Sequence, residues 1–590
     1  MKSAVPFIPP ARSRRVPLAL SILSLVVVLS GCGGGDSPAA PAAASAVTTA
    51  TIDQAEAVRL LDQATFGATP ADVTRLRALG ARAWIDEQMA LPVTLGRTHW
   101  EVLDAQNKLT DPTGTSRDEV YSAVWRNAIV APDQLRQRVA YALSQIMVVS
   151  MVDSGVNDQP RAVVHYYDTL AQHAFGSYRE LLEAVALHPA MGIYLSHLRN
   201  QKEDPAKGRV PDENFAREVM QLFSIGLVEL ELDGSVKGGI SGALETYGAD
   251  DISGLAKVFT GWSWDCGSDT SDSCFYSWTG LAPTNPDVNI RSMRSYARYH
   301  SASAKQVLGS SLAASSDAAG SLKTALDRLA AHPNVGPFIG RQLIQRLVTS
   351  HPSPAYVGRV ARAFNDNGSG QRGDLKAVIT AVLLDPEART PAASQLDTYG
   401  KLREPVLRLS KTLRAFGASS DSGKWLIGNT DDPATALGQS PLRSPSVFNF
   451  YRPGYVPPNT AAAARSLTVP EMQITHETSV AGYANYMRGV VQSGAGNTPS
   501  GATRRDVQLQ LDAAIAAADR PAELVALVNS RLFGGAMQAD LAAPIQAAVE
   551  SISVPVISLT NATAVANALA NRARVAIYLS LVSPEFIVQK

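Results

Sequence analysis

Apolar residues recur at every third or fourth position along most of the chain after residue 53, which is the period of an amphipathic helix. Thr69 is a good N-cap before Pro70, and Gly80 ends the helix that they begin. The pattern then predicts helices over residues 81–89, 118–130, 133–149, 162–173, 178–187, 212–225, 250–260, 321–329, 335–349, 354–365, 374–384, 401–416, 504–517, 521–532, 540–550 and 565–582. Strand patterns are few, and residues 228–232 and 276–278 predict a small hairpin.

The predicted fold is therefore mainly α, a large helical bundle-like body with long loops and at most a small β-hairpin. The loops at 227–249, 262–304 and 422–470 exceed about 15 residues, a length at which a loop is usually functional or disordered. We expect one helical domain over residues 53–590. A Gly-, Ser- and Pro-rich patch near 493–503 is either a boundary within that domain or a surface loop.

The helix predicted inside residues 211–226 carries two stripes. Asp212 suits the N-cap and Gly226 the left-handed position after the last turn. The apolar stripe consists of Phe215, Val219, Leu222 and Phe223, and the polar stripe of Asn214, Arg217, Glu218 and Gln221. The polar stripe is either a solvated face with charge pairs or a row buried between helices or lining a pocket.

The first residues have the pattern of a secretory signal. Basic residues precede an apolar run over 16–29, which is too short for a membrane span of about 20 residues. The run ends in Leu29-Ser30-Gly31-Cys32, which resembles the lipobox of bacterial lipoproteins. The resemblance implies cleavage after residue 31 and lipidation of Cys32, and several acyl chains would anchor the protein stably. Gly33 in place of Asp favours the outer membrane by the same analogy.

The export route stays open between the general secretory and the twin-arginine pathways. Ser13-Arg14-Arg15 resembles a twin-arginine signal, but Pro17 stands where that motif has a bulky apolar residue. Residues 32–52 are rich in Ala, Pro, Ser and Gly and predict a flexible tether between the lipid and the helical domain.

Charge excludes one class of partner. The precursor has zero net charge, and the signal carries four basic and no acidic residues, so the mature chain lies near −4. A weakly acidic surface without a basic run has no long-range attraction for nucleic acid. We therefore expect no nucleic-acid partner.

Cysteine and histidine usage predicts a disulfide and no metal site. Cys266 and Cys274 bracket a polar loop, and in an oxidising compartment a bond between them would add about 2 kcal/mol of stability. As metal ligands they are weak candidates, since no histidine lies between them. The nine histidines are dispersed, and His188 before Pro189 is expected to cap a helix. No sequence pattern indicates a particular cofactor.

Several ordered motifs run through the helical region. They are LHPAMGIYL at 187–195, NFAREVMQLFSIG at 214–226, YGADD at 247–251 with FTGW at 259–262, YH at 299–300 with Lys305 and LG at 308–309, FNDNG at 364–368 with RGDL at 372–375, SPSVFNFY at 444–451 and SPEF at 583–586. Together they resemble the bacterial "domain of unknown function 1800" family from about residue 55 to the end. The family resemblance implies an exported, mostly helical protein without an established activity. It also implies an association with an exported partner that is sulfatase-like or alkaline-phosphatase-like.

Two positions depart from the family pattern: Asp212 replaces a usual Asn, and Gln221 replaces a usual acidic residue. Among the motif residues we select Glu218, Asp251 and His300 as candidate acid/base groups, because a carboxylate beside a histidine can transfer protons. The candidate binding residues are Asn214, Arg217, Trp262 and Lys305. The alternative is that Arg217 pairs with Asp251, or Glu218 with Lys305, and that these ion pairs only lock helices and loops together.

The segment 444–458 carries aromatic residues between prolines and also allows two interpretations. Its aromatic rings could stack on a sugar or peptide, or they could pin the segment across the helical body. The aromatic residues are Phe448, Phe450, Tyr451 and Tyr455.

The sequence leaves two hypotheses about function. The first is an envelope lipoprotein that binds a partner protein or polymer in assembly, export or surface display. The second is a hydrolase acting on an envelope or extracellular polymer, with Glu218 and His300 as the acid/base pair.

Overall fold

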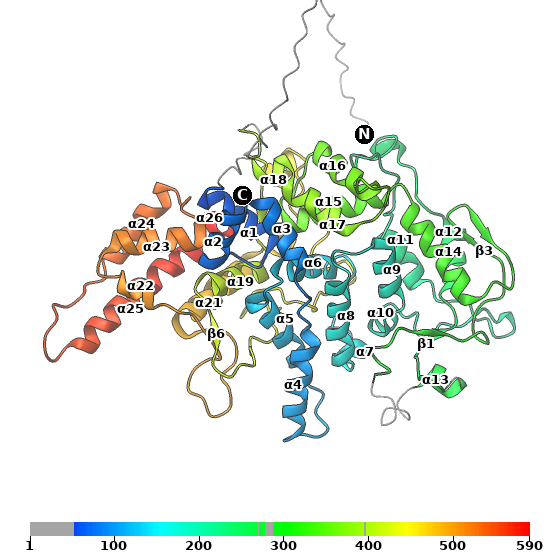
Figure 1. Cartoon of the computed structure of the whole chain (residues 1–590), viewed down its shortest axis with the longest axis horizontal. Coiled ribbons are helices and arrows are strands. Elements are labelled where there is room, and N and C mark those ends of the chain that lie inside the picture. The colour runs from blue at the N-terminus through cyan, green and yellow to red at the C-terminus, as the bar shows by residue number, and fades with distance from the viewer. Residues whose placement is uncertain (1–51, 270, 278–286, 394–396) are drawn as a thin grey trace, which may run out of the picture. The chain divides into compact units, whose positions relative to one another are not determined.

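The computed structural model describes residues 52–590 except 270, 278–286 and 394–396, and the stretch Ala50–Lys590 forms one compact unit (Figure 1). The predicted signal, Cys32 and nearly all of the tether lie outside the described residues. The unit is mainly helical with a few short antiparallel strand pairs, so the predicted fold class is confirmed. None of the helices that the structure describes combines the length and hydrophobicity that crossing a membrane requires.

The helices of the first half include α8, which packs against six of the others. They are α1 (Gln54–Ala64), α2 (Pro70–Leu79), α3 (Ala81–Ala90), α4 (Gly96–Lys108), α5 (Asp118–Val130), α6 (Gln134–Ser144), α7 (Ser154–Asn157), α8 (Pro160–Gln172), α9 (Tyr178–Ala186), α10 (Pro189–Tyr194), α11 (Asn214–Gln221), α12 (Ala249–Val258) and α13 (Asp272–Tyr276). Helix α8 packs against α4, α5 and α6 on one side and against α7, α9 and α10 on the other. It thereby connects the N-terminal helices to the helices that carry the family motifs.

The second half continues the same core. Its helices are α14 (Ala318–Ala331), α15 (Val335–Leu347), α16 (Pro354–Asn365), α17 (Leu375–Leu384), α18 (Pro386–Arg389), α19 (Pro405–Ala415), α20 (Ala461–Ala464), α21 (Glu477–Ser493), α22 (Asp512–Ala516), α23 (Pro521–Phe533), α24 (Ala539–Glu550), α25 (Ala562–Leu581) and α26 (Pro584–Ile587). Helices α15, α16 and α17 pack on one another (Figure 1). Helix α19 is buried along its whole length, so it is the centre of this half.

The strand pairs are short and antiparallel. They are β1 (Trp262–Ser263) with β2 (Arg294–Ser295), β3 (Lys305–Val307) with β4 (Ser310–Leu312), β5 (Lys401–Leu402) with β8 (Val588–Gln589), and β6 (Ser419–Ser420) with β7 (Val507–Gln508). Short 3-10 helices cover Pro205–Lys207, Ile240–Gly242 and Pro470–Ile474. The pair β5–β8 joins the start of the α19 segment to the C-terminal strand, which the sequence pattern did not predict.

The predicted start of α2 is confirmed. The Thr69 hydroxyl accepts a hydrogen bond from the backbone N–H of Asp72, and the Asp72 carboxylate accepts one from the backbone N–H of Thr69. Pro70 occupies the first turn. The helix ends before Gly80, whose φ of 82° suits a glycine.

The predicted hairpin between residues 228–232 and 276–278, of which 278 lies outside the described residues, is wrong. Tyr276 is the last residue of the short helix α13, in which Cys274 and Phe275 are buried. Because Tyr276 is part of a helix, it forms no hairpin with residues 228–232. Val228 and Leu230 instead form isolated bridges to Glu245 and Val236.

The helix predicted over 504–517 is reduced to α22, and the one over 401–416 begins only at Pro405. Val507 and Gln508 pair with β6, which uses their backbone groups in a strand. Pro405 disfavours a helical conformation for the residue before it, so Lys401 and Leu402 are free to form β5.

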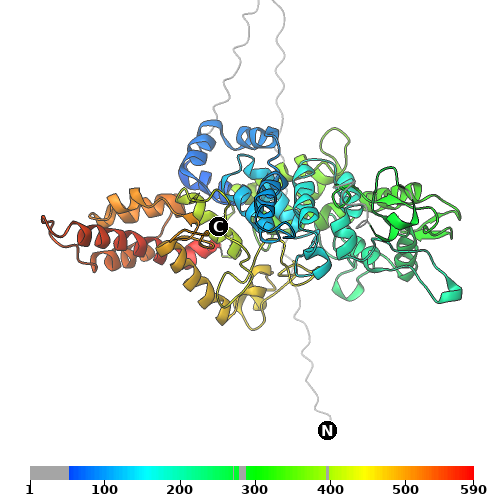
Figure 2. The same cartoon turned by 90° about the horizontal axis from the view of Figure 1, so that it is seen from below.

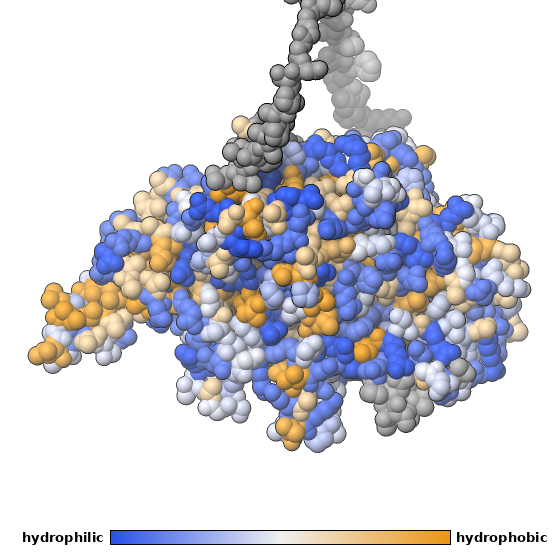
Figure 3. All heavy atoms as spheres, in the orientation of Figure 1, coloured by the Kyte–Doolittle hydropathy of each residue, from blue (hydrophilic) through white to orange (hydrophobic). Residues whose placement is uncertain are grey.

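The hairpin of α24 and α25 ends in an apolar loop. No charged residue occurs between Glu550 and Arg572. Val556, Ile557 and Leu559 expose their side chains at this loop. Figures 1 and 2 show the connecting end of the hairpin extending away from the helices around α19, and Figure 3 shows apolar residues gathered there.

Candidate functional site

Helix α11 carries the largest group of candidate residues. It begins at Asn214, whose N–H donates to Asp212 Oδ1 at 2.8 Å, but the N-cap residue is Glu213 instead of the predicted Asp212. Gly226 has φ 73° and donates its N–H to the carbonyl of Met220. The apolar stripe lies inward, with Phe215, Val219 and Phe223 buried.

Some residues of the polar stripe of α11 form a solvated face and another is buried, so each of the two interpretations holds for part of the stripe. Arg217 is exposed and pairs with Glu213 at 3.3 Å, and Asn214 is also exposed. Glu218 is only 7% exposed, and within the described residues its Oε2 atom has no hydrogen-bond partner. Burial raises the pKa of Glu218, and Arg217 acts in the opposite direction. Glu218 is thus a buried carboxyl group, whereas its two neighbours form a solvated face.

Asp251 fixes a turn to the beginning of α12. Its Oδ2 accepts the N–H of Gly248 at 3.0 Å, and its Oδ1 accepts the N–H of Leu308 at 2.6 Å. Strand β3 then crosses α12 at Gly254, where a Cβ atom would lie 1.8 Å from the carbonyl oxygen of Gln306. Both oxygens of Asp251 therefore serve the fold.

His300 lies beyond the other end of α12. Its Nδ1 donates to the carbonyl oxygen of Thr260 at 2.8 Å, and burial lowers the pKa of its imidazole. Gly261 has φ 77°, and a Cβ atom there would lie 2.7 Å from the backbone nitrogen of His300. Trp262 is buried and donates its indole N–H to Val258.

Lys305 is buried below His300 and is held by backbone carbonyls. Its Nζ donates to Ser301 at 2.9 Å and to Ser303 at 3.3 Å, and burial lowers its pKa. The nearby carboxylate is that of Glu203, which accepts hydrogen bonds from the hydroxyl groups of the same two serines. The spacing of motif residues gave no signal for Glu203.

No hydrogen bond or ion pair joins any two of the three candidate acid/base groups, all of which the structure describes. Helix α12 rises by about 1.5 Å per residue, so the segment between Asp251 and Thr260 holds Asp251 and His300 more than about 10 Å apart. Neither alternative ion pair forms, because Arg217 binds Glu213 and Lys305 binds backbone oxygens. The YGADD, FTGW and YH motifs together attach the β3–β4 hairpin and the 299–305 segment to α12.

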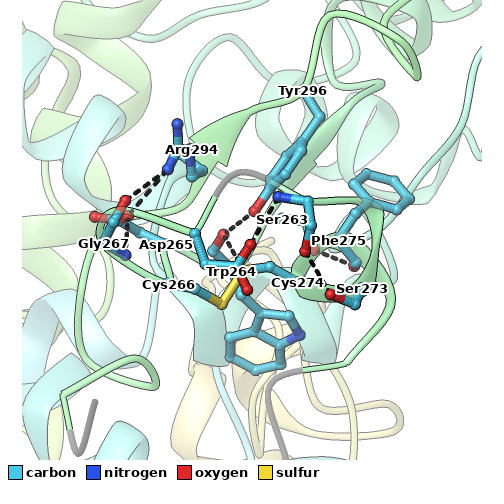
Figure 4. Close-up of a disulfide and its surroundings, with 12 residues drawn as sticks. Ser263, Trp264, Asp265, Cys266, Gly267, Ser273, Cys274, Phe275, Arg294 and Tyr296 are labelled. Atoms are coloured by element: carbon cyan, nitrogen blue, oxygen red, sulfur yellow. Dashed lines mark hydrogen bonds and ion pairs between the residues drawn. A yellow bond between two sulfur atoms is a disulfide. The ribbon is translucent and has the colours of Figure 1, made fainter. Parts of the chain in front are cut away.

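A disulfide closes the loop at residues 266–274, which precedes the 299–305 segment and the β3–β4 hairpin in the chain. Cys266 and Cys274 are bonded as predicted, with Cα atoms 6.2 Å apart (Figure 4). Beside them the Tyr296 hydroxyl donates to the carbonyl oxygen of Trp264 at 2.8 Å. The disulfide and this hydrogen bond hold the backbone between β1 and α13.

A groove lies where the end of α11 meets α15 and the segment 444–458. It consists of two adjoining cavities of about 290 and 250 Å³, which share the residues Gly226, Leu227, Phe338, Gln342, Pro453 and Gly454. We call it the arginine groove, because Arg341, Arg346 and Arg452 line it and no described carboxylate does. Most of its other lining side chains are apolar. It joins two motif segments that are more than 200 residues apart in the sequence.

The segment 444–458 supports both interpretations at different residues. Tyr451 is buried and donates its hydroxyl to Glu404 at 2.7 Å, and Gln345 donates to the carbonyl of Pro453 at 3.0 Å. These contacts pin the segment. Phe448 lines the groove, with the guanidinium of Arg452 4.8 Å from its ring centre. A stacking face therefore remains at the groove.

A buried charged cluster around α19 was not found from the sequence. Glu404 Oε2 accepts hydrogen bonds from the side chains of four residues, Tyr141, Gln145, Gln439 and Tyr451. Lys401 pairs with Glu471 at 3.3 Å, and Arg414 pairs with Asp72 at 2.8 Å. Cations spaced along one helix look like a solvated face in a sequence, and only their acidic partners far away in the chain reveal that they are buried.

Comparison with known proteins gives one match. The family model described as "Protein of unknown function (DUF1800)" matches residues 59–588. The chain belongs to the DUF1800 family. No curated protein and no solved structure matches it.

The DUF1800 match covers α11, α12, the arginine groove and α19. Gln221 lines the groove at a place where the family resemblance implies an acidic residue, so the groove of this chain lacks that carboxylate. Within the described residues, no three His, Cys, Asp or Glu side chains are grouped to hold a metal ion.

Proposed function

We propose that this DUF1800 protein is an envelope-anchored lipoprotein that binds an exported partner protein through the arginine groove. The observation that carries the proposal is the lining of the groove, with three arginines, aromatic and aliphatic walls and no described carboxylate. Arg341 is half-buried, and burial lowers its pKa because it disfavours the charged guanidinium. An anionic group of a partner would compensate that charge.

The charge and the walls define the segment that would bind. An acidic side chain or a terminal carboxylate would neutralise the arginines, and an apolar or aromatic side chain beside it would cover Leu227 and Phe448. The family resemblance suggests an exported sulfatase-like or alkaline-phosphatase-like protein as the source of that segment. Assembly, export or surface display of such a partner would be the role of the complex.

A photoreactive amino acid at Leu227 tests the groove directly. Leu227 is 55% exposed and lines it, and Val102 on α4 is 52% exposed and serves as the matched control position. In envelopes, we expect a specific adduct from position 227 alone, and sequencing should locate the bond in a segment with adjacent acidic and apolar residues. Arg341→Gln should reduce the yield, whereas Arg488→Gln on the exposed side of α21 should not. The same adducts from both positions would contradict the proposal.

The proposed location in the cell envelope has its own test. Cys32→Ser removes the proposed lipidation site, so the variant should lose the acyl mass and leave the membrane fraction. Mass spectrometry of the purified protein and fractionation of cells provide the readouts. Retention of an unmodified leader on the native protein would overturn this part of the proposal.

One observation favours a second function, a hydrolase in which Glu218 acts as the acid. Its buried carboxyl has a raised pKa and an oxygen without a described partner, which are properties of a general acid. Against a pair with His300, no hydrogen bond or ion pair joins these two described side chains, and His300 Nδ1 donates to the carbonyl oxygen of Thr260 instead. For an enzyme, Glu218→Gln should abolish polymer hydrolysis by envelope fractions and leave the melting temperature unchanged. Full activity of this variant would exclude that role.

A further inference from the structure

A second cavity, of about 560 Å³, lies between α1, the start of α19, the end of α23 and the C-terminal segment. Asp62, Arg403 and Lys411 line it, and all three are more than nine-tenths buried. The family motif at 583–586 contributes Pro584 and Glu585 to its lining, but none of the candidate site residues in the sequence pointed to this place. A cavity with a few converging charged groups is a common form of small-molecule site.

Three charges meet at the inner end of the cavity. Asp62 Oδ2 accepts hydrogen bonds from Arg403 Nη2 at 3.0 Å and from Lys411 Nζ. The other oxygen of Asp62 has no partner among the described residues. Among the described residues the Lys411 ammonium donates a hydrogen bond only to Asp62, so two of its three N–H groups remain for a ligand.

These charges do not cancel. Two cations share one carboxylate at the inner end, and Arg59, Lys590 and Glu585 also line the cavity, so its lining holds four cationic and two carboxylate side chains. Burial lowers the pKa of Lys411 to about 8, although Asp62 acts in the opposite direction. The ammonium therefore remains charged at neutral pH and lacks a full counter-charge.

The walls of the cavity are apolar. Val58, Leu532, Phe533, Pro584 and Val588 form them, and the side chains come from four separate elements. A bound inorganic anion would leave this surface in contact with water, whereas an organic anion would cover it.

We propose that this cavity binds a small organic monoanion, a carboxylate with a short aliphatic tail. The carboxylate contacts Lys411 and Arg403, and the tail lies along Val58 and Phe533. The proposal is independent of the arginine groove, which is lined by other elements.

Isothermal titration calorimetry with three probes that share one tail tests the ligand class. Octanoate should bind the native protein, octanol should bind at least about tenfold more weakly, and octylammonium should give no binding, because only the head group changes. The affinity for octanoate should fall as the pH rises above about 8, when Lys411 loses its proton. Asp62, Arg59, Arg403, Glu585 and Lys590 are the charged groups that face Lys411 across the cavity. Equal affinities for octanoate and octylammonium, or no octanoate binding at about 1 mM, would overturn the proposal.

Two variants locate the site. Lys411→Gln removes the ammonium and leaves the pair of Asp62 with Arg403, so octanoate should bind at least about tenfold more weakly. Ala536→Trp closes the rim without touching the three charges, and it should abolish binding even if Lys411→Gln fails to fold. Ala547→Trp, on the exposed face of α24, is the control and should bind octanoate normally. Native affinity in Ala536→Trp would overturn the proposal, and Arg341→Gln in the groove should leave octanoate binding unchanged.

Discussion

At the scale of single residues, buried charges in this protein are held by several partners each. Burial opposes ionisation of Glu404, yet Lys401, Arg138 and four hydrogen bonds hold its pKa below the ordinary value. Such a group is expensive to lose because its partners stay behind without compensation. The cluster therefore contributes strongly to specifying how α6, α19 and the segment 444–458 fit together.

Glu404→Gln should lower the free energy of unfolding by about 3–5 kcal/mol, since buried Arg138 loses its counter-charge and Lys401 keeps only Glu471. Urea denaturation followed by circular dichroism measures the change. Glu550→Gln at the exposed end of α24 is the matched control and should stay within about 0.5 kcal/mol of the native protein. A cost for Glu404→Gln as small as that of the control would show that the cluster is not a determinant of stability.

Asp168 gives a prediction about pH. Its side chain accepts the N–H groups of Gly96 at 2.7 Å and Arg97 at 2.9 Å at the start of α4. Burial nevertheless raises its pKa to about 7. Between about pH 4 and pH 7 the folded protein keeps a proton that the unfolded chain has lost, so this group makes the free energy of unfolding fall as the pH rises.

Asp168→Asn should remove that contribution, which amounts to about 1.4 kcal/mol for each unit of pKa difference. Denaturation of both proteins at several pH values measures it. The native protein should lose stability relative to the variant as the pH rises through this window. The opposite trend would mean that the N-terminus of α4 lowers the pKa of Asp168 by more than burial raises it.

At the scale of elements, the close crossing of β3 over α12 depends on one glycine. In most helices Gly→Ala stabilises by up to about 1 kcal/mol, because alanine is the better helix former. Gly254→Ala should instead destabilise the protein by more than about 2 kcal/mol, since its Cβ would overlap the carbonyl oxygen of Gln306. The melting temperature gives the readout.

Gly358→Ala in α16 is the matched control for Gly254→Ala. The nearest atom to its Cβ would be 3.6 Å away, so this substitution should be neutral or stabilising. A similar small effect at both positions would mean that β3 moves aside easily. That outcome would also weaken the structural role assigned to Asp251.

The elements also show where sequence patterns were sufficient. Helix α16, with a regular apolar stripe, a capping Ser353 and a proline at its start, begins and ends where the pattern predicts, and so does α5, which has no side-chain cap. The segment 504–511 has helical periodicity too, but its backbone pairs with β6 and its Asp506 binds the 420–426 loop. A contact that far along the chain leaves no local signal.

At the scale of the whole molecule, the two ends of the described chain are built into one core. Asp62 of α1 pairs with Arg403, and Arg403 lies 5.2 Å from the ring centre of Phe586 in α26. Strand β8 then pairs with β5 directly before α19. A destabilising substitution in the C-terminal segment should therefore also destabilise the N-terminal helices.

Phe586→Ala should lower the free energy of unfolding by about 3–5 kcal/mol in a single cooperative transition, because the ring is 1% exposed in this shared core. Calorimetry measures the transition. Leu559→Ala at the apolar loop after α24 removes a side chain that is fully exposed and should leave the transition unchanged. Two separate transitions in Phe586→Ala would show that the C-terminal helices form an independent unit.

The sequence by itself determined the mainly helical fold, most helix positions, the disulfide and the family, because each depends on local periodicity, capping, spacing or motif order. It also selected the polar row on α11, but not which member of that row is buried. Tertiary structure decided the separation of Asp251 from His300, the burial of the cations of α19, the arginine groove and the cavity at Lys411. Each of these depends on contacts between segments that are distant in the sequence, and burial, partners and charge balance are properties of those contacts.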